Sequence, residues 1–209
     1  VKKLCGRYYA SVACPENNIK DIKLLIKDML RDIILINYKY VFFKKSLNIK
    51  ISDKALESLF YTSITLYDRD YDYELLNLNL ATEKELTVDG IFNFCLNDLK
   101  TRWITVAQIL QDNFYSDNDR DAIYEFIKHI IYSLPNKLNE VNIYKKEDLY
   151  VFLDGNGKSI DEFISANGGE LASKIIFVNP ALINFYDCND RQTMTFLKNI
   201  FNERIKFYR

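Results

Sequence analysis

The chain has 209 residues, of which 48% are hydrophobic, 14% aromatic and 27% charged, which excludes an intrinsically disordered chain. This length suits one domain with a sizeable core or two small domains. The 28 Lys and Arg residues and 29 Asp and Glu residues leave a formal net charge of −1, so no global positive field attracts nucleic acid or anionic lipid, although a local basic patch remains compatible with this balance.

The first 18 residues contain neither an unbroken apolar run of signal-peptide length nor an initiator Met, so we expect a trimmed chain without a secretion signal. The four cysteines, Cys5, Cys14, Cys95 and Cys188, lack C-x-x-C spacing and are too few for a disulfide scaffold. We therefore expect buried free thiols in a reducing cytoplasm.

The first helical pattern starts at Asn17 or Asn18, and either residue could cap it. Seven apolar residues then recur at the three-and-four spacing of one helix face: Ile22, Leu25, Ile26, Met29, Leu30, Ile33 and Ile34. Core packing is the first interpretation of this stripe, and binding of a partner protein is the alternative. A membrane span over 24–43 is excluded by five charged residues, Lys27, Asp28, Arg31, Asp32 and Lys39.

Four more helices are predicted before Pro135, over 54–68, 71–79, 92–114 and 117–134. Ser52 and Asp53 open the first of them with capping side chains. The last begins on the aspartates of 117–121, which suit the positive end of the helix dipole. It ends at Pro135, which cannot continue a helix.

Beyond Pro135, VNIY (141–144) and LYVFL (149–153) predict a β-hairpin. The elements predicted after it are a short helix over 160–164, a helix over 169–179, a strand over 182–187, a helix over 190–203 and a strand over 204–208. We predict an α+β fold, mainly α: a helical bundle followed by a small α/β layer with a β-hairpin and a C-terminal β-α-β unit. The predicted domains are a mainly helical 1–135 and a small α/β 136–209, which could pack as one unit.

The stretch FLDGNGKSIDEF, residues 152–163, has the composition of a calcium or phosphate loop without its spacing. With Gly157 as the invariant glycine of an EF-hand loop, Phe152 and Phe163 occupy the positions of the first and last ligands. A Walker A loop needs four residues between its glycines, and Gly155 and Gly157 are only two positions apart. We predict a tight turn over 154–158, with Ser159 or Asp161 capping the next helix.

The run YDRDYDYE places Asp68, Asp70 and Asp72 at alternate positions, which in an extended segment would point to one side and could attract a divalent cation. Neither a Gly nor a Glu follows in ligand register. A solvated helix junction is therefore the preferred interpretation, and adventitious metal binding is the alternative. The acidic run 117–121 is interpreted in the same way.

His129 is the only histidine, which excludes a multi-histidine metal site. On a helical wheel it borders the apolar face, where we expect a hydrogen bond to a neighbour in preference to a role as a base. The patterns G-x-S-x-G, H-E-x-x-H and G-x-G-x-x-G are absent. We assign no catalytic, cofactor-binding or metal-ligating residue and predict a non-enzymatic protein.

Aromatic residues alternate with Lys and Arg in NIYKKEDLYVF and IKFYR, as a platform for stacking single-stranded nucleic acid requires. Any half-buried strand alternates in this way, so we prefer the structural interpretation.

Several segments carry a resemblance to a known family. They are DMLRDIILINYKYVFF, LTVDGIFNFCLNDLKTRW, YEFIKHIIY with NEVNIY and LYVFLDGNGKSI, and ASKIIFVNPALINFYD with FLKNIFNERIKFY. In the order and spacing of these segments the chain resembles the YtxC-like sporulation proteins of endospore-forming bacteria, whose molecular function is not established. The resemblance implies a cellular setting and no site, because the family has no agreed catalytic residues.

We expect a non-enzymatic cytoplasmic protein associated with sporulation that acts through contacts with an unknown protein partner. One alternative is an enzyme that depends on a divalent metal or a nucleotide, through Asp68, Asp70 and Asp72 or the turn over 154–158. The other is a module that binds single-stranded nucleic acid through the aromatic strands.

Overall fold

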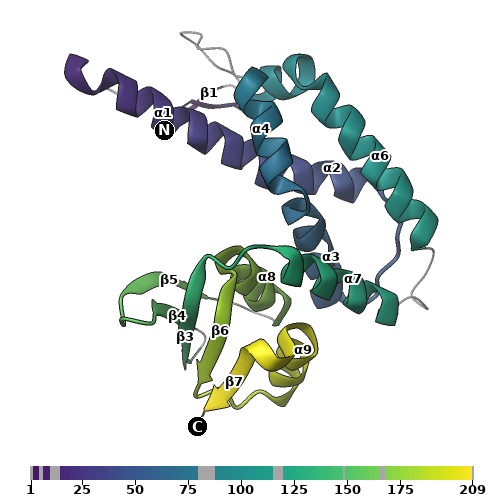
Figure 1. The fold of residues 1–209 in the computed structure, drawn as a ribbon, viewed down its shortest axis with the longest axis vertical. Coiled ribbons are helices and arrows are strands. Elements are labelled where there is room, and N and C mark those ends of the chain that lie inside the picture. The colour runs from purple at the N-terminus through teal and green to yellow at the C-terminus, as the bar shows by residue number, and fades with distance from the viewer. Residues whose placement is uncertain are drawn as a thin grey trace.

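The computed structural model describes residues 2–4, 7–9, 15–79, 88–114, 120–147, 149–164 and 168–208. It has an α+β fold, mainly α, as the sequence predicts (Figure 1). The first part holds β1 (Lys2–Leu4), β2 (Arg7–Tyr9), α1 (Ile19–Asp32), α2 (Lys39–Ser46), α3 (Lys54–Leu66), α4 (Arg69–Asn79), α5 (Val88–Gly90), α6 (Asn97–Asn113) and α7 (Arg120–Ser133). The second part holds β3 (Leu138–Lys146), β4 (Leu149–Asp154), β5 (Ser159–Ile164), α8 (Gly168–Val178), β6 (Pro180–Tyr186), α9 (Arg191–Phe201) and β7 (Ile205–Tyr208).

The first helical pattern continues from α1 through a π-helical turn, Ile33–Tyr38, into α2. Asn18 is its N-cap residue, as expected, although its side chain makes no capping hydrogen bond. Asp53 caps α3 as predicted, because its Oδ1 accepts hydrogen bonds from the backbone N–H of Ala55 at 3.0 Å and of Leu56 at 3.2 Å. None of the helices in the described part of the chain combines the length and the hydropathy that crossing a membrane requires.

The second part is built on a sheet with strand order β5-β4-β3-β6-β7. β3 and β4 pair antiparallel, so the predicted hairpin is confirmed. β6 runs parallel to both β3 and β7, and α9 connects β6 to β7, which confirms the predicted β-α-β unit.

The prediction of a short helix over 160–164 is wrong, because these residues belong to β5, which pairs antiparallel with β4. The tight turn that precedes β5 brings the chain back alongside β4. There the backbone groups on the edge of β4 away from β3 pair with β5. Hydrogen bonding to this edge outweighs a local helical pattern only five residues long, which is too short to be stable alone.

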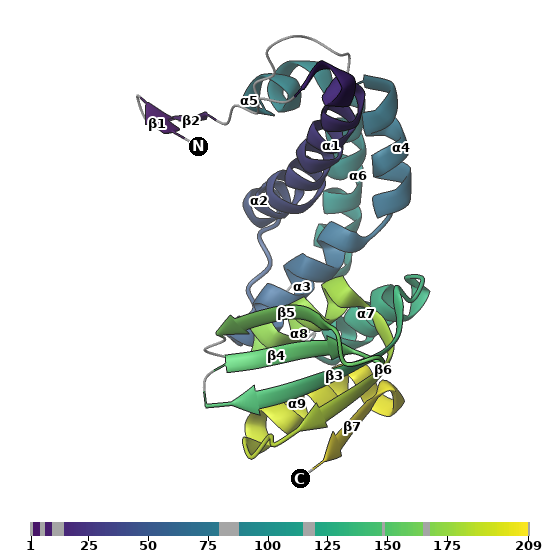
Figure 2. The same ribbon diagram turned by 90° about the vertical axis from the view of Figure 1, so that its left-hand side faces the viewer.

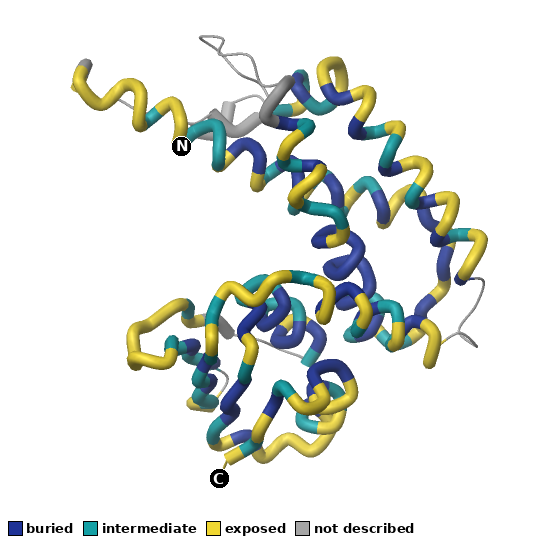
Figure 3. Tube along the Cα trace, viewed as in Figure 1, coloured by how far each residue is buried: buried dark blue, intermediate teal, exposed yellow. Residues whose placement is uncertain are grey.

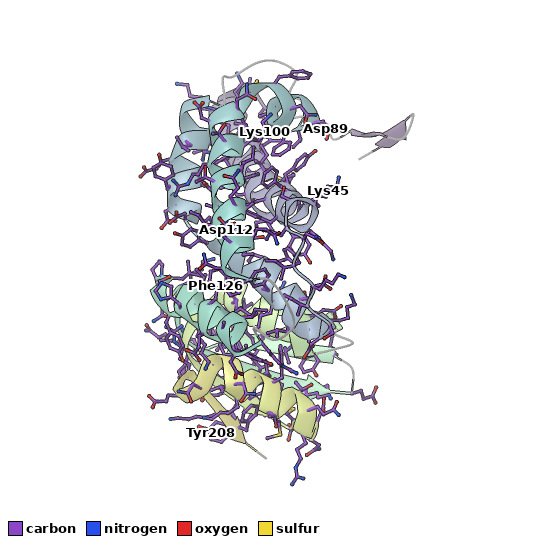
Figure 4. All side chains as sticks on the ribbon, turned by 90° about the vertical axis from the view of Figure 1, so that its right-hand side faces the viewer. Lys45, Asp89, Lys100, Asp112, Phe126 and Tyr208 are labelled. Carbon is purple, nitrogen blue, oxygen red and sulfur yellow. The ribbon has the colours of Figure 1, made fainter. Side chains whose placement is uncertain are left out.

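Helices cover one face of the sheet. α8 and α9 pack on it, α3 contacts α8, and α7 contacts α9. In Figure 4, which is viewed from this side, α7 and α9 stand in front of the strands. The opposite face of the sheet is turned toward the viewer in Figure 2, and no helix of the described chain lies across it.

The core runs without interruption from the helical part into the sheet. Buried residues of α3, such as Phe60, belong to the same apolar cluster as Ile143 of β3 and Phe185 of β6. α3 lies at the centre of this core, and its residues 59–66 are all buried (Figure 3). The domain boundary predicted at residue 135 stays a prediction.

We expect the substitution Gly169→Ala to destabilise the fold. A Cβ at Gly169 would lie 2.6 Å from Cα of Ala55 in α3, so backbone would have to move to admit it. Overpacking of this kind costs about 1–3 kcal/mol. Urea unfolding measures the change, and Gly168→Ala is the control, since its Cβ would meet atoms no closer than 3.4 Å. Equal stability of the two variants would contradict the tight packing of α3 on α8.

Candidate functional site

The structure separates the three aspartates of the acidic run. They do not lie on an extended segment, because Asp70 and Asp72 belong to the first turn of α4 and Asp68 immediately precedes it. Asp70 is exposed, whereas Asp72 is only 1% exposed. Residues two positions apart on a helix point about 200° apart around its axis, so these two carboxylates do not converge.

Asp72 is the centre of a buried ionic network. Its Oδ2 accepts hydrogen bonds from Lys39 Nζ at 2.7 Å and from Trp103 Nε1 at 3.1 Å. Lys39 Nζ also donates to the backbone carbonyl of Tyr67 at 2.6 Å. Burial lowers the pKa of the Lys39 ammonium, and the Asp72 carboxylate opposes that shift. The network joins α2, α4 and α6 and gives each buried charge a partner.

Arg102 of α6 extends the network to the surface. Its guanidinium bonds to the Asp68 carboxylate, and its Nε lies 3.6 Å from Asp72 Oδ1. It also lies over the ring of Tyr71, 4.1 Å from the centroid. Asp68 and Asp72 are therefore neutralised by cations of the protein itself. Within the described ranges, no group of three or more His, Cys, Asp or Glu side chains is arranged to hold a metal ion.

A surface depression of about 560 Å³ lies beside this network. Its lining includes Asp68, Asp98, Arg102 and Ile109. Arg102 is the only cation among the lining residues, and it already pairs with Asp68. The depression thus presents no unpaired positive charge to the phosphates of a nucleotide.

The tight turn predicted over 154–158 is present, and the side chain of Asp154 holds it. Asp154 Oδ1 accepts hydrogen bonds from the backbone N–H of Asn156 at 2.9 Å and of Lys158 at 2.8 Å. Gly157 has φ +79° and donates its N–H to the Asp154 carbonyl at 2.9 Å. These backbone donors point into the turn, whereas a phosphate loop directs them toward a ligand.

Among the residues that the structure describes, His129, Cys95 and Cys188 belong to no cluster that could hold a metal ion. His129 is exposed on α7. Cys188 is buried as expected, but Cys95 is exposed at the end of a π-helical turn, so the expectation of buried thiols is wrong at that position. Cys5 and Cys14 lie outside the described residues.

Three tyrosines form a ladder on the open face of the sheet. The rings of Tyr144 on β3 and Tyr186 on β6 stack with centroids 4.6 Å apart, and those of Tyr186 and Tyr208 on β7 with centroids 5.0 Å apart. Phe207 and Tyr150, from the same aromatic runs, instead contact Phe185 in the core, so the alternation is that of a half-buried sheet. Because each ring in the ladder stacks on its neighbour, most of its faces are occupied and unavailable to nucleic-acid bases.

The apolar stripe of the first helix is the feature that the structure leaves exposed. Leu30 and Ile34 are buried, but Leu25 is 55% exposed and Met29 is 56% exposed. Leu24, at 58%, is also exposed. Core packing, the first interpretation of the stripe, is therefore wrong at Leu25 and Met29, whereas Ile22 and Ile26 are half-buried. Figure 3 shows it as a largely exposed helix that extends from the bundle.

Sequence reasoning underestimated this surface because periodicity shows that a helix has an apolar face but not what covers it. The charged residues within 19–32 were the available signal. Four basic and three acidic residues in fourteen give the helix a well-solvated polar face, as in a helix that projects into solvent.

Comparisons of the chain with protein-family models, with curated proteins and with solved structures gave no match. The resemblance to the YtxC-like family therefore stays a prediction.

We expect the buried pair of Lys39 and Asp72 to show strong coupling. Asp72→Asn would leave the Lys39 ammonium buried without its counter-charge. Lys39→Met would leave the buried carboxylate with Arg102, whose Nε lies 3.6 Å from Asp72 Oδ1, as its cationic neighbour. Each single substitution should lower the free energy of unfolding by about 3–5 kcal/mol. The double substitution should lower it by much less than the sum of the two single losses. Urea unfolding of the four proteins measures the coupling. If the double variant lost the sum of the two single losses in unfolding free energy, the two charges would not be coupled.

Proposed function

We propose that the protein acts by binding another protein through the apolar stripe of α1, in which Ile19, Leu25 and Met29 are exposed and Ile22 and Ile26 are half-buried. The observation that carries this proposal is the exposure of Leu25 and Met29 side by side on a helix that extends from the bundle. Residues four apart lie on the same helix face, so the two side chains form a continuous apolar surface. An amphipathic helix of this kind is a common means of binding a groove or another helix.

The remaining features favour binding over catalysis. Asp68 and Asp72 are paired with Arg102 and Lys39, and the backbone donors of the turn over 154–158 serve the turn itself. A protein-binding function requires none of these groups to be free. We also propose the cytoplasm of a spore-forming cell as the setting, which is supported by the sequence resemblance alone.

The proposal predicts that Leu25→Lys with Met29→Lys abolishes partner capture. Two ammonium groups in the stripe would have to be desolvated on binding, whereas in the free protein both remain in water. The measurement is a pull-down of the tagged protein after crosslinking in cells, with growing cultures compared with spore-forming cultures. A stoichiometric protein in the wild-type sample should be absent from the double variant.

The matched control is Ile104→Lys with Ile109→Lys on α6, where both isoleucines are exposed, at 47% and 56%. This control should capture the partner as the wild type does. Unchanged melting temperatures would show that both double variants are folded. Equal capture by the α1 variant and the wild type would reject α1 as the binding surface.

A further inference from the structure

No further inference is drawn: the strongest candidate, the open face of the sheet with the stacked rings of Tyr144, Tyr186 and Tyr208 (Figure 2), is an unpartnered surface, and nothing in the described part of the chain shows which partner covers it.

Discussion

The rest of the structure depends on the complete burial of the C-terminal part of α3. Its segment LFYTSITL, residues 59–66, contains no charge, and all eight residues are buried. A helical segment without a solvent face needs neighbours on every side, and α2, α7 and α8 all pack against α3. The hydroxyl groups of Thr62 and Thr65 are compatible with this position because they donate to the carbonyls of Ser58 and Tyr61, one turn earlier. The helical part and the sheet are thus joined through one helix.

The buried ionic network has a comparable role within the helical part. Lys39 and Asp72 are 33 positions apart in sequence, and each is almost fully buried. A pair of this kind adds little net stability, but a rotation of α2 or α4 that separated the charges would be costly. We interpret the pair as a constraint on the relative rotation of these helices. The same ion pairs occupy two of the three carboxylates of the acidic run, those of Asp68 and Asp72.

Two of the exposed surfaces that contain apolar or aromatic side chains differ in chemistry. The tyrosine ladder on the open face of the sheet is stabilised internally, because Tyr186 stacks on both Tyr144 and Tyr208. In the stripe of α1, by contrast, Leu25 and Met29 remain more than half exposed. Burial of apolar surface on binding is favourable, so the stripe, and not the ladder, is the surface from which association gains most.

The amino-acid sequence by itself determined the features that depend on near neighbours in the chain. The helical periodicity of α3 and α7, the β3-β4 hairpin, the cap at Asp53 and the turn at Asp154 and Gly157 all follow from residues within a few positions of one another. Tertiary structure alone decided whether residues 160–164 would be a helix or a strand, because the edge of β4 supplies the hydrogen bonds. It also decided that Asp72 faces Lys39 while Asp70 faces solvent, and that Leu25 is exposed while Leu30 is buried. Local patterns specify an apolar face or a charge, but what covers that face or pairs with that charge comes from residues distant in the sequence.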